Sequence, residues 1–127
     1  MKLLVTGGAG FIGSNFVRRA LAGELPGLAD PTITVLDALT YSGTLTNLTS
    51  VENHPHYTFV QGSILDEQLL AELVPGHDAI VHFAAESHVD RSVKDAGVFV
   101  ETNVGGTQRL LDSALRAGNM RFVHVST

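Results

Sequence analysis

The 127-residue sequence contains no cysteine. Neither a disulfide framework nor a thiolate zinc site can therefore form, and nothing marks a secreted protein. Long hydrophobic runs are also missing. The opening apolar residues stop at Thr6, far short of a signal-peptide core, and no stretch approaches the length of a membrane span. We expect a cytoplasmic protein that does not enter a membrane.

Basic residues are few. Eight Lys and Arg stand against 13 Asp and Glu, which gives a formal net charge of −5. Such a balance repels nucleic-acid backbones and anionic membrane surfaces, so no nucleic acid is expected as a partner. A nucleotide ligand is not excluded, because local backbone dipoles decide a single phosphate site. The length and the 44% hydrophobic content fit one domain over residues 1–127.

Short apolar runs alternate with helical patterns, which is typical of strand-helix units around a parallel sheet. The fold class predicted is therefore α/β. Strands are predicted at residues 2–6, 32–36, 57–61, 78–83 and 121–126. A long loop is predicted at residues 38–55, and a loop of that length is often functional.

Three helices are predicted, at residues 11–22, 66–73 and 96–117. Glycine follows the first and third, and Pro75 follows the second, as expected where helices end. A glycine pair, Gly105 and Gly106, interrupts the third and indicates either a kink or close packing against a neighbour. Arg18 and Arg19 are expected to face solvent. The first helix is expected to place Ile12, Phe16 and Ala20 on its apolar face, and the second to carry Leu69, Leu70 and Leu73 inward. In the third helix, Leu110 with Ala114 and Leu111 with Leu115 form an apolar stripe, which is a candidate surface for self-association.

A glycine array, Gly7, Gly10 and Gly13, lies between the first predicted strand and the first predicted helix. Glycine permits unusual backbone angles, gives pyrophosphate a bare surface and allows close packing of helix on strand. The amides near Phe11 and Ile12 then open a helix N-terminus onto phosphates. Such an array also occurs in ordinary turns, but its position here favours dinucleotide binding.

Asp37 ends the second predicted strand, near the offset of about 20 residues at which an acidic side chain meets the adenosine ribose. A carboxylate there accepts hydrogen bonds from both ribose hydroxyls and repels a 2′-phosphate. NAD is therefore favoured over NADP. A solvated turn aspartate is the alternative, since Asp is common at strand ends.

The ends of the third and fourth predicted strands carry small residues, at 62–64 and 83–87. Ligands of open α/β sheets bind at such carboxyl ends, so the first segment is expected beside the adenine and the second along the far half of the cofactor. The small size of Ala84 and Ala85 indicates either clearance for a ligand or ordinary packing.

With these pieces in place, the sequence resembles the extended short-chain dehydrogenase/reductase superfamily and, within it, the dTDP-glucose 4,6-dehydratase family, from end to end. The resemblance implies a Rossmann-type doubly wound parallel sheet with five of its strands present. VHFAAESHVDRS is the most specific of the segments that carry the resemblance. These are VTGGAGFIGSNF (5–16), LDALTY (36–41), VHFAAESHVDRS (81–92), Thr102 to Val104 with Gly106 and Thr107, and FVHVST (122–127).

The resemblance implies site residues as well as a fold. The residues implied for NAD are Gly7, Gly10, Phe11, Ile12, Gly13, Asp37, Ala38, Leu39, Thr40, Ser63, Ile64, Phe83, Ala84, Ala85, Glu86, Ser87 and Thr102. Ser87, His88 and Thr127 are implied for the sugar nucleotide, with Thr127 at the reacting carbon as the catalytic residue. Ser63 departs from the aspartate usual in the family, which removes a charge beside the adenine.

The implied reaction converts dTDP-glucose to dTDP-4-keto-6-deoxyglucose with tightly bound NAD, by oxidation at C4, loss of water across C5 and C6, and reduction at C6. The superfamily's Tyr-x-x-x-Lys pair is absent, because Leu45 and Gln61 stand four residues after the two tyrosines, Tyr41 and Tyr57. The family's Asp-Glu couple is expected just after Thr127. We therefore expect an incomplete NAD-binding domain that is inactive alone, and a homodimer of the complete protein through the third helix.

Six histidines raise the possibility of a metal site. They lack a helical pair and a pattern of supporting carboxylates, so solvated or core positions are expected and no metal is predicted. Two other functions stay open beside the dehydratase. One is a sugar-nucleotide epimerase or decarboxylase of the same superfamily, and the other is a non-catalytic dinucleotide-binding module.

Overall fold

The computed structural model describes residues 1–40, 43–84, 97, 100–118 and 120–125, in which strands and helices alternate. The elements in chain order are β1 (Lys2–Thr6), α1 (Phe11–Leu21), β2 (Thr32–Asp37), the 3₁₀ helix η1 (Leu45–Val51), β3 (Tyr57–Gln61), α2 (Glu67–Leu73), β4 (Ala79–His82), the π-helical turn η2 (Glu101–Gly106), α5 (Thr107–Arg116) and β5 (Arg121–His124). The five strands lie where they are predicted, with small differences at their ends.

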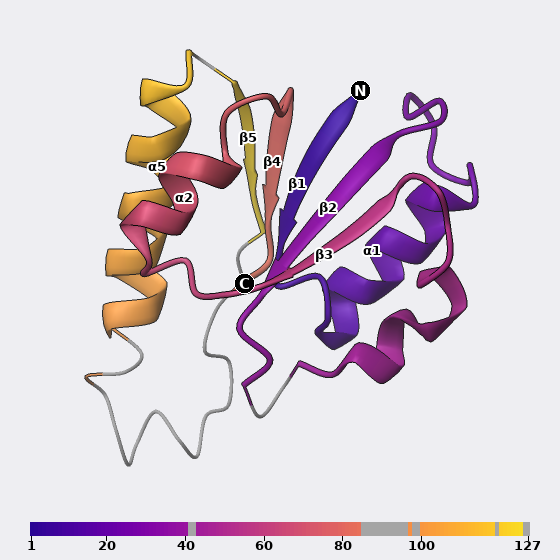
Figure 1. Ribbon diagram of the computed structural model, residues 1–127, viewed down its shortest axis with the longest axis horizontal. Helices are drawn as coiled ribbons and strands as arrows, with labels where there is room; N and C mark the ends of the chain where they lie inside the picture. The colour runs from indigo at the N-terminus through magenta and orange to yellow at the C-terminus, as the bar shows by residue number, and fades with distance from the viewer. Residues whose placement is uncertain (41–42, 85–96, 98–99, 119, 126–127) are drawn as a thin grey trace.

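The five strands form one parallel sheet in the order β3-β2-β1-β4-β5. The chain moves outward from β1 to β3 and then crosses back to β4, so the strand order reverses between β1 and β4. Helix α1 and η1 lie on one side of the sheet, and α2 and α5 lie on the other (Figure 1). The predicted Rossmann-type fold class is confirmed. Ligands of such sheets bind where the order reverses, at the carboxyl ends of the strands.

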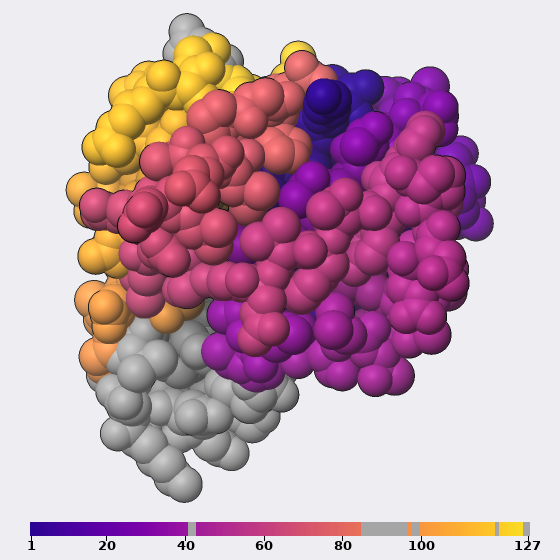
Figure 2. Space-filling view, viewed as in Figure 1, coloured from indigo at the N-terminus to yellow at the C-terminus, as the bar shows by residue number. Residues whose placement is uncertain are grey.

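Apolar side chains fill both faces of the sheet, because successive residues of a strand point to opposite sides. Leu3 and Val5 of β1 join the cluster under α1 and η1, whereas Leu4 joins the cluster under α2 and α5. β5 is less covered, with Val123 45% exposed. In the space-filling view, atoms of α2 and β3 occupy much of the visible face, and α5 lies at one side (Figure 2).

Helix α1 buries Val17 and Ala20, and Phe16 packs at the edge of the same cluster. The prediction that Ile12 faces the core is wrong, because its side chain is 61% exposed in the first turn. Arg18 does not simply face solvent either: it is half-buried and donates a 2.6 Å hydrogen bond to the carbonyl of Asn47.

The segment predicted as a long loop contains η1. Thr44 caps this helix by accepting the amide of Thr46. Leu48 and Val51 are buried three residues apart in the core under α1. Three-residue spacing places two side chains on one face of a 3₁₀ helix, which explains how so short an element packs.

Turn η2 leads directly into α5, where Leu110 and Ala114 are buried as predicted. Leu111 and Leu115, the other pair of the predicted apolar stripe, are 45% and 69% exposed. Close packing at the glycine pair is confirmed at Gly106. A Cβ there would lie 2.5 Å from Cδ1 of Ile64, so a larger residue would require the Ile64 side chain to move.

Candidate functional site

The glycine turn joins β1 to α1 at the carboxyl edge of the sheet. Gly7 has φ +72°, and its amide donates to the carbonyl of Leu36 over 2.8 Å. A Cβ on Gly7 would lie 2.6 Å from the backbone nitrogen of Ala84, and a Cβ on Gly13 would meet the Gly7 carbonyl oxygen. Glycine is required at both positions because three pieces of backbone touch there: the ends of β1 and β4 and the start of α1.

Helix α1 opens from this turn with Gly10 as its N-cap, and no side chain caps it. The first amide bonded at this end belongs to Ser14, which donates to the Gly10 carbonyl over 2.9 Å. Within the described residues, the amides of Phe11, Ile12 and Gly13 have no such partner. Phe11 and Ile12 are 89% and 61% exposed. The turn therefore presents free N–H groups and the positive end of a helix dipole to solvent, which suits a phosphate.

Asp37 ends β2 beside this helix start. Its Oδ2 accepts the amide of Ala9 over 2.9 Å, and its Oδ1 accepts the amide of Leu39 over 2.8 Å. Only 9% of Asp37 is exposed, so the solvated turn aspartate considered from the sequence does not describe it. Each carboxylate oxygen has two lone pairs, so one on each remains for a ligand hydroxyl.

Ala38, Leu39 and Thr40 follow Asp37 across the same edge. Leu39 has φ +55°, in the left-handed region that a leucine seldom adopts. Its amide bond to Asp37 and the packing of its side chain against the α1-side core stabilise that conformation. Ala38 and Thr40 are exposed.

Ala9 connects the glycine turn to η1, a link that is not predicted from the sequence. Its carbonyl accepts the amide of Thr44 over 3.2 Å and the side-chain amide of Asn47 over 2.9 Å. The Asn47 carbonyl in turn accepts from Arg18 of α1. These bonds hold the loop after β2 against the turn. The signal in the sequence from which η1 could have been found is Thr44 as an N-cap before the Leu48 and Val51 pair.

Ser63 and Ile64 follow the end of β3, where the adenine is predicted. The Ser63 hydroxyl oxygen accepts the amide of Leu65 over 3.0 Å, and the Ser63 carbonyl accepts that of Asp66 over 3.1 Å. Ile64 is 5% exposed and packs against Gly106. Ser63 thus shapes the turn into α2, while the Ile64 side chain belongs to the core beneath it.

Phe83 and Ala84 follow β4. The Phe83 amide donates to the carbonyl of Thr6 over 2.9 Å, and its ring lies 5.5 Å from that of Phe16. The Ala84 amide approaches the Thr6 hydroxyl at 3.4 Å. Thr102 is half-buried in η2. The remaining predicted site residues lie outside the described part of the chain: Ala85, Glu86, Ser87, His88 and Thr127.

His82, the last residue of β4, is 1% exposed, as expected of a histidine satisfied in the core. Its Nδ1 lies 2.6 Å from the Thr6 hydroxyl oxygen, and its Nε2 lies 3.0 Å from that of Thr107. Burial, assisted by the neighbouring ring of His124, lowers the pKa of His82 to about 4. The imidazole is therefore neutral at physiological pH.

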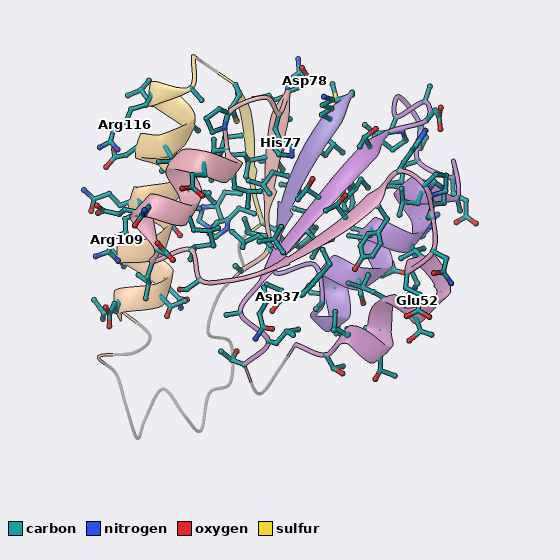
Figure 3. All side chains as sticks on the ribbon, in the orientation of Figure 1. Asp37, Glu52, His77, Asp78, Arg109 and Arg116 are labelled. Atoms are coloured by element: carbon teal, nitrogen blue, oxygen red, sulfur yellow. The ribbon has the colours of Figure 1, made fainter. Side chains whose placement is uncertain are left out.

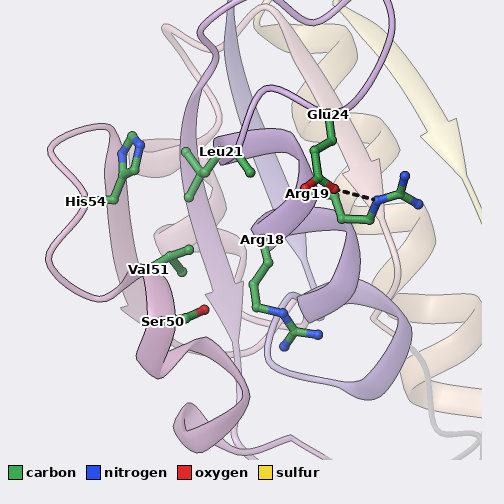
Figure 4. Close-up of a pocket in the computed structure, with 8 residues that line it drawn as sticks. Arg18, Arg19, Leu21, Glu24, Ser50, Val51 and His54 are labelled. Atoms are coloured by element: carbon green, nitrogen blue, oxygen red, sulfur yellow. Dashed lines mark hydrogen bonds and ion pairs between the residues drawn. The ribbon is translucent and has the colours of Figure 1, made fainter.

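A hollow of about 380 Å³ lies elsewhere, beside the end of α1 and the end of η1 (Figure 4). Both of its guanidinium groups already have partners. Arg19 pairs with Glu24 at 3.1 Å, and Arg18 binds Asn47. The carboxylate of Asp37 lies at the opposite end of the sheet from His77 and Asp78, which precede β4 (Figure 3). The candidate site is therefore the edge with the glycine turn and Asp37.

Among the described residues, no group of three His, Asp or Glu side chains is arranged to hold a metal ion. No helix within those ranges is long and apolar enough to cross a membrane.

The family model for GDP-mannose 4,6 dehydratase matches residues 4–127. The chain belongs to this family. It is 58% identical over its whole length to a dTDP-glucose 4,6-dehydratase of Streptomyces niveus, of which it covers 38%. The chain thus spans about two fifths of the length of such relatives, and the resemblance found in its motifs is confirmed.

Solved structures agree with this assignment. A double mutant of a dTDP-glucose 4,6-dehydratase from Streptomyces venezuelae, with NAD and DAU bound, superposes with a TM-score of 0.97 at 60% identity, over 100% of this chain and 39% of that one. A UDP-glucose 4-epimerase from Thermotoga maritima superposes with a TM-score of 0.84 at 32% identity, over 100% of this chain and 38% of that one. The fold is shared by both enzymes, and the sequence is much closer to the dehydratase.

Proposed function

We propose that this chain is the NAD-binding part of a dTDP-glucose 4,6-dehydratase. The observation that carries the proposal is the convergence of three features at one sheet edge. These are the bare glycine turn, the exposed start of α1 and the Asp37 carboxylate. They match the needs of a dinucleotide in order: room for the pyrophosphate, donors for its charge and an acceptor for the ribose.

The amides of Phe11 and Ile12 would hold the pyrophosphate, because they are free and exposed. Asp37 would accept the ribose hydroxyls with its remaining lone pairs and disfavour the 2′-phosphate of NADP. When bound, NAD supplies reversible hydride transfer at the hexose, and the residues of this chain bind and orient it. Roles for Ser87, His88 and Thr127 toward the sugar nucleotide are supported by the sequence motifs alone.

An epimerase is the second candidate, because the Thermotoga maritima enzyme shares the fold. The 58% and 60% identities to dehydratases, against 32% to this epimerase, favour dehydration. A non-catalytic dinucleotide-binding module needs the same edge but no sugar chemistry, so product analysis separates it from both enzymes.

A homodimer of the complete protein is also proposed, through the outer face of η2 and α5. Four large apolar side chains are exposed along this stretch, between 45% and 69% each. Leucine and valine at that density suit a helix-helix contact better than solvent. These side chains, called the outer helix face below, are Val100, Val104, Leu111 and Leu115. A cytoplasmic location is proposed from the lack of cysteine.

The first experiment is incubation of the complete gene product with dTDP-glucose and product analysis by mass spectrometry and NMR. We expect a 4-keto-6-deoxy sugar nucleotide. Its mass should be about 18 units lower than that of the substrate, because one water molecule is lost. A C4 epimer of unchanged mass would establish the epimerase instead, and NAD binding without any product would establish the module.

A matched pair of glycine variants ties the activity to the turn. Gly13→Ala places a Cβ against the Gly7 carbonyl oxygen, so bound NAD and turnover should both fall at least about tenfold, the loss expected when one good contact is disrupted. Gly105→Ala is the control, because its Cβ would lie 3.8 Å from a side-chain nitrogen of Arg109, which is ordinary packing. If the two variants held equal amounts of NAD, the proposed role of the glycine turn in NAD binding would be contradicted.

A further inference from the structure

A buried chain of hydrogen bonds crosses the sheet beside the candidate site. Thr6 ends β1 and lies opposite His82, which ends β4, in the strand register. His82 bonds the Thr6 hydroxyl through Nδ1 at 2.6 Å and the Thr107 hydroxyl through Nε2 at 3.0 Å. Thr6 is fully buried and His82 is 1% exposed, so water does not compete for these bonds.

The outer bonds of the chain fix the position of the imidazole proton. Thr107 donates its hydroxyl proton to the Asn103 carbonyl over 2.8 Å, so it accepts from His82. His82 is therefore protonated on Nε2, and its Nδ1 accepts the proton of the Thr6 hydroxyl. The Thr6 oxygen remains an acceptor, which the Ala84 amide approaches at 3.4 Å. Every donor in this series of hydrogen bonds therefore points the same way, from the Ala84 amide toward the Asn103 carbonyl.

The surroundings of the ring favour this neutral form. Thr6 faces it from β1 and Thr107 faces it from α5, and both are uncharged. From β5 come Phe122 and His124, with ring centroids 5.9 Å and 5.1 Å away. Among the described residues, His124 is the titratable neighbour that acts on His82, and its like charge disfavours a second imidazolium.

Each end of this series of hydrogen bonds reaches a segment of the candidate site. Gly7 directly follows Thr6, and its Cα faces the Ala84 backbone, so the Thr6–His82 bond sets how the ends of β1 and β4 abut. Thr107 directly follows η2, the turn that contains Thr102, and it is bonded back to Asn103 within that turn. A shift of the imidazole would move the strand ends relative to η2.

We propose that His82 is a positioning residue, whose Nε2-protonated imidazole fixes the η2 turn against the ends of β1 and β4 so that Gly7, Ala84 and Thr102 present one surface to the cofactor. The inference rests on the proposed NAD site. It adds a residue that touches neither phosphate nor ribose and acts through two threonine hydroxyls.

The arrangement of protons is tested without any ligand. In the complete gene product labelled with ¹⁵N-histidine, the nitrogen shifts of His82, assigned with His82→Asn, should show a protonated Nε2 and a bare Nδ1 at pH 7. Both should stay constant down to about pH 5, because the ring remains neutral. A protonated Nδ1, or an imidazolium at pH 6, would overturn the proposed chain whether or not NAD binds.

The coupling to the site is tested at Thr107. Thr107→Val keeps the shape but removes the hydroxyl, so the Kd of the NAD-stripped protein for NAD should rise roughly tenfold, the effect of one lost buried hydrogen bond. Thr107→Ser restores the hydroxyl and should bring the Kd within about twofold of wild type.

Ser113→Ala is the matched control. Ser113 also lies in α5, is buried, and donates its hydroxyl to the Leu70 carbonyl over 3.2 Å, away from His82. This variant should lower Tm without changing the Kd for NAD. If Thr107→Val lowers Tm but leaves the Kd at the wild-type value, His82 is structural only and the inference fails. If the wild type itself binds no NAD, the proposed function fails. The nitrogen shifts still test the hydrogen bonds of His82 in that case.

Discussion

The Asp37 carboxylate accepts the amides of Ala9 and Leu39 at 2.9 Å and 2.8 Å, so it joins the glycine turn to the loop after β2. An acidic residue at this place can be predicted from the sequence, because its offset from the glycine turn suits ribose binding. Its two amide bonds cannot, because one depends on the path of the glycine turn at Ala9 and the other on the left-handed conformation at Leu39. One side chain therefore has both a structural role and a proposed binding role.

Replacing Asp37 with Asn should weaken both roles. The amide group keeps one acceptor and turns an NH₂ toward a backbone N–H, so stability should fall by about 1–3 kcal/mol. The Kd for NAD should rise about tenfold or more, and the preference for NAD over NADP should shrink. Calorimetric titration of the NAD-stripped protein with each dinucleotide measures both changes.

Asp78→Asn provides the control for this replacement. Asp78 also accepts a backbone amide, that of Lys2 at 2.7 Å, but at the opposite end of the sheet (Figure 3). Its loss should leave the ratio of NAD to NADP affinity unchanged. A ratio in Asp37→Asn equal to that of Asp78→Asn would contradict the ribose role.

At the scale of elements, β1 and β3 are predicted with their observed bounds, because their apolar runs end at clear turn signals. η1 is not predicted from the sequence, because the bonds that hold it against the glycine turn and α1, made by Asn47 and Arg18, join residues far apart in the chain. The π-helical turn also escapes prediction. Its glycine pair indicates a kink or close packing, and the structure identifies the neighbour packed against Gly106 as the Ile64 side chain.

The outer helix face is also only partly predictable from the sequence. The sequence pattern identifies Leu111 and Leu115 as apolar positions but does not say which partner they contact. In the structure they face away from the sheet, since Leu110 and Ala114 occupy the core side of α5. A helix with apolar side chains on two faces needs a partner on each.

A charge on this outer helix face should separate a dimer. Leu115→Glu buries a carboxylate in the proposed contact, which is strongly unfavourable without a partner. Light scattering of the complete gene product should show a dimer for wild type and mainly monomer for this variant. Ala71→Glu, at an exposed position of α2, is the control and should stay dimeric. A monomeric wild type, or a dimeric Leu115→Glu, would rule out this surface.

At the scale of the whole molecule, the reversal of strand order between β1 and β4 explains why the site forms where it does. Thr6 and His82 end adjacent parallel strands, so the glycine turn and the residues Phe83 and Ala84 follow them at the same edge of the sheet. The position of this edge follows from the alternation of strands and helices alone. The bonds that align it, through His82, required the structure.

The same histidine makes the stability of the fold depend on pH. Burial and His124 lower the pKa of His82 from 6.5 to about 4 in the folded protein, so the unfolded chain binds this proton more readily between those values. Stability from this group is complete above about pH 6.5 and declines as pH falls toward 4, by about 3 kcal/mol in total. Urea unfolding of the complete gene product at pH 7, 6 and 5 should follow this decline.

Two variants separate His82 from the carboxylates that also titrate at low pH. His82→Asn lacks the titrating ring, so its stability, though lower at pH 7, should fall less between pH 7 and pH 5. His77→Asn removes a ring that contacts Thr34 through Nε2 at 3.2 Å, at the opposite end of the sheet, and should keep the wild-type slope. Equal slopes for wild type and His82→Asn would mean that the buried imidazole is not the group whose protonation destabilises the fold in acid.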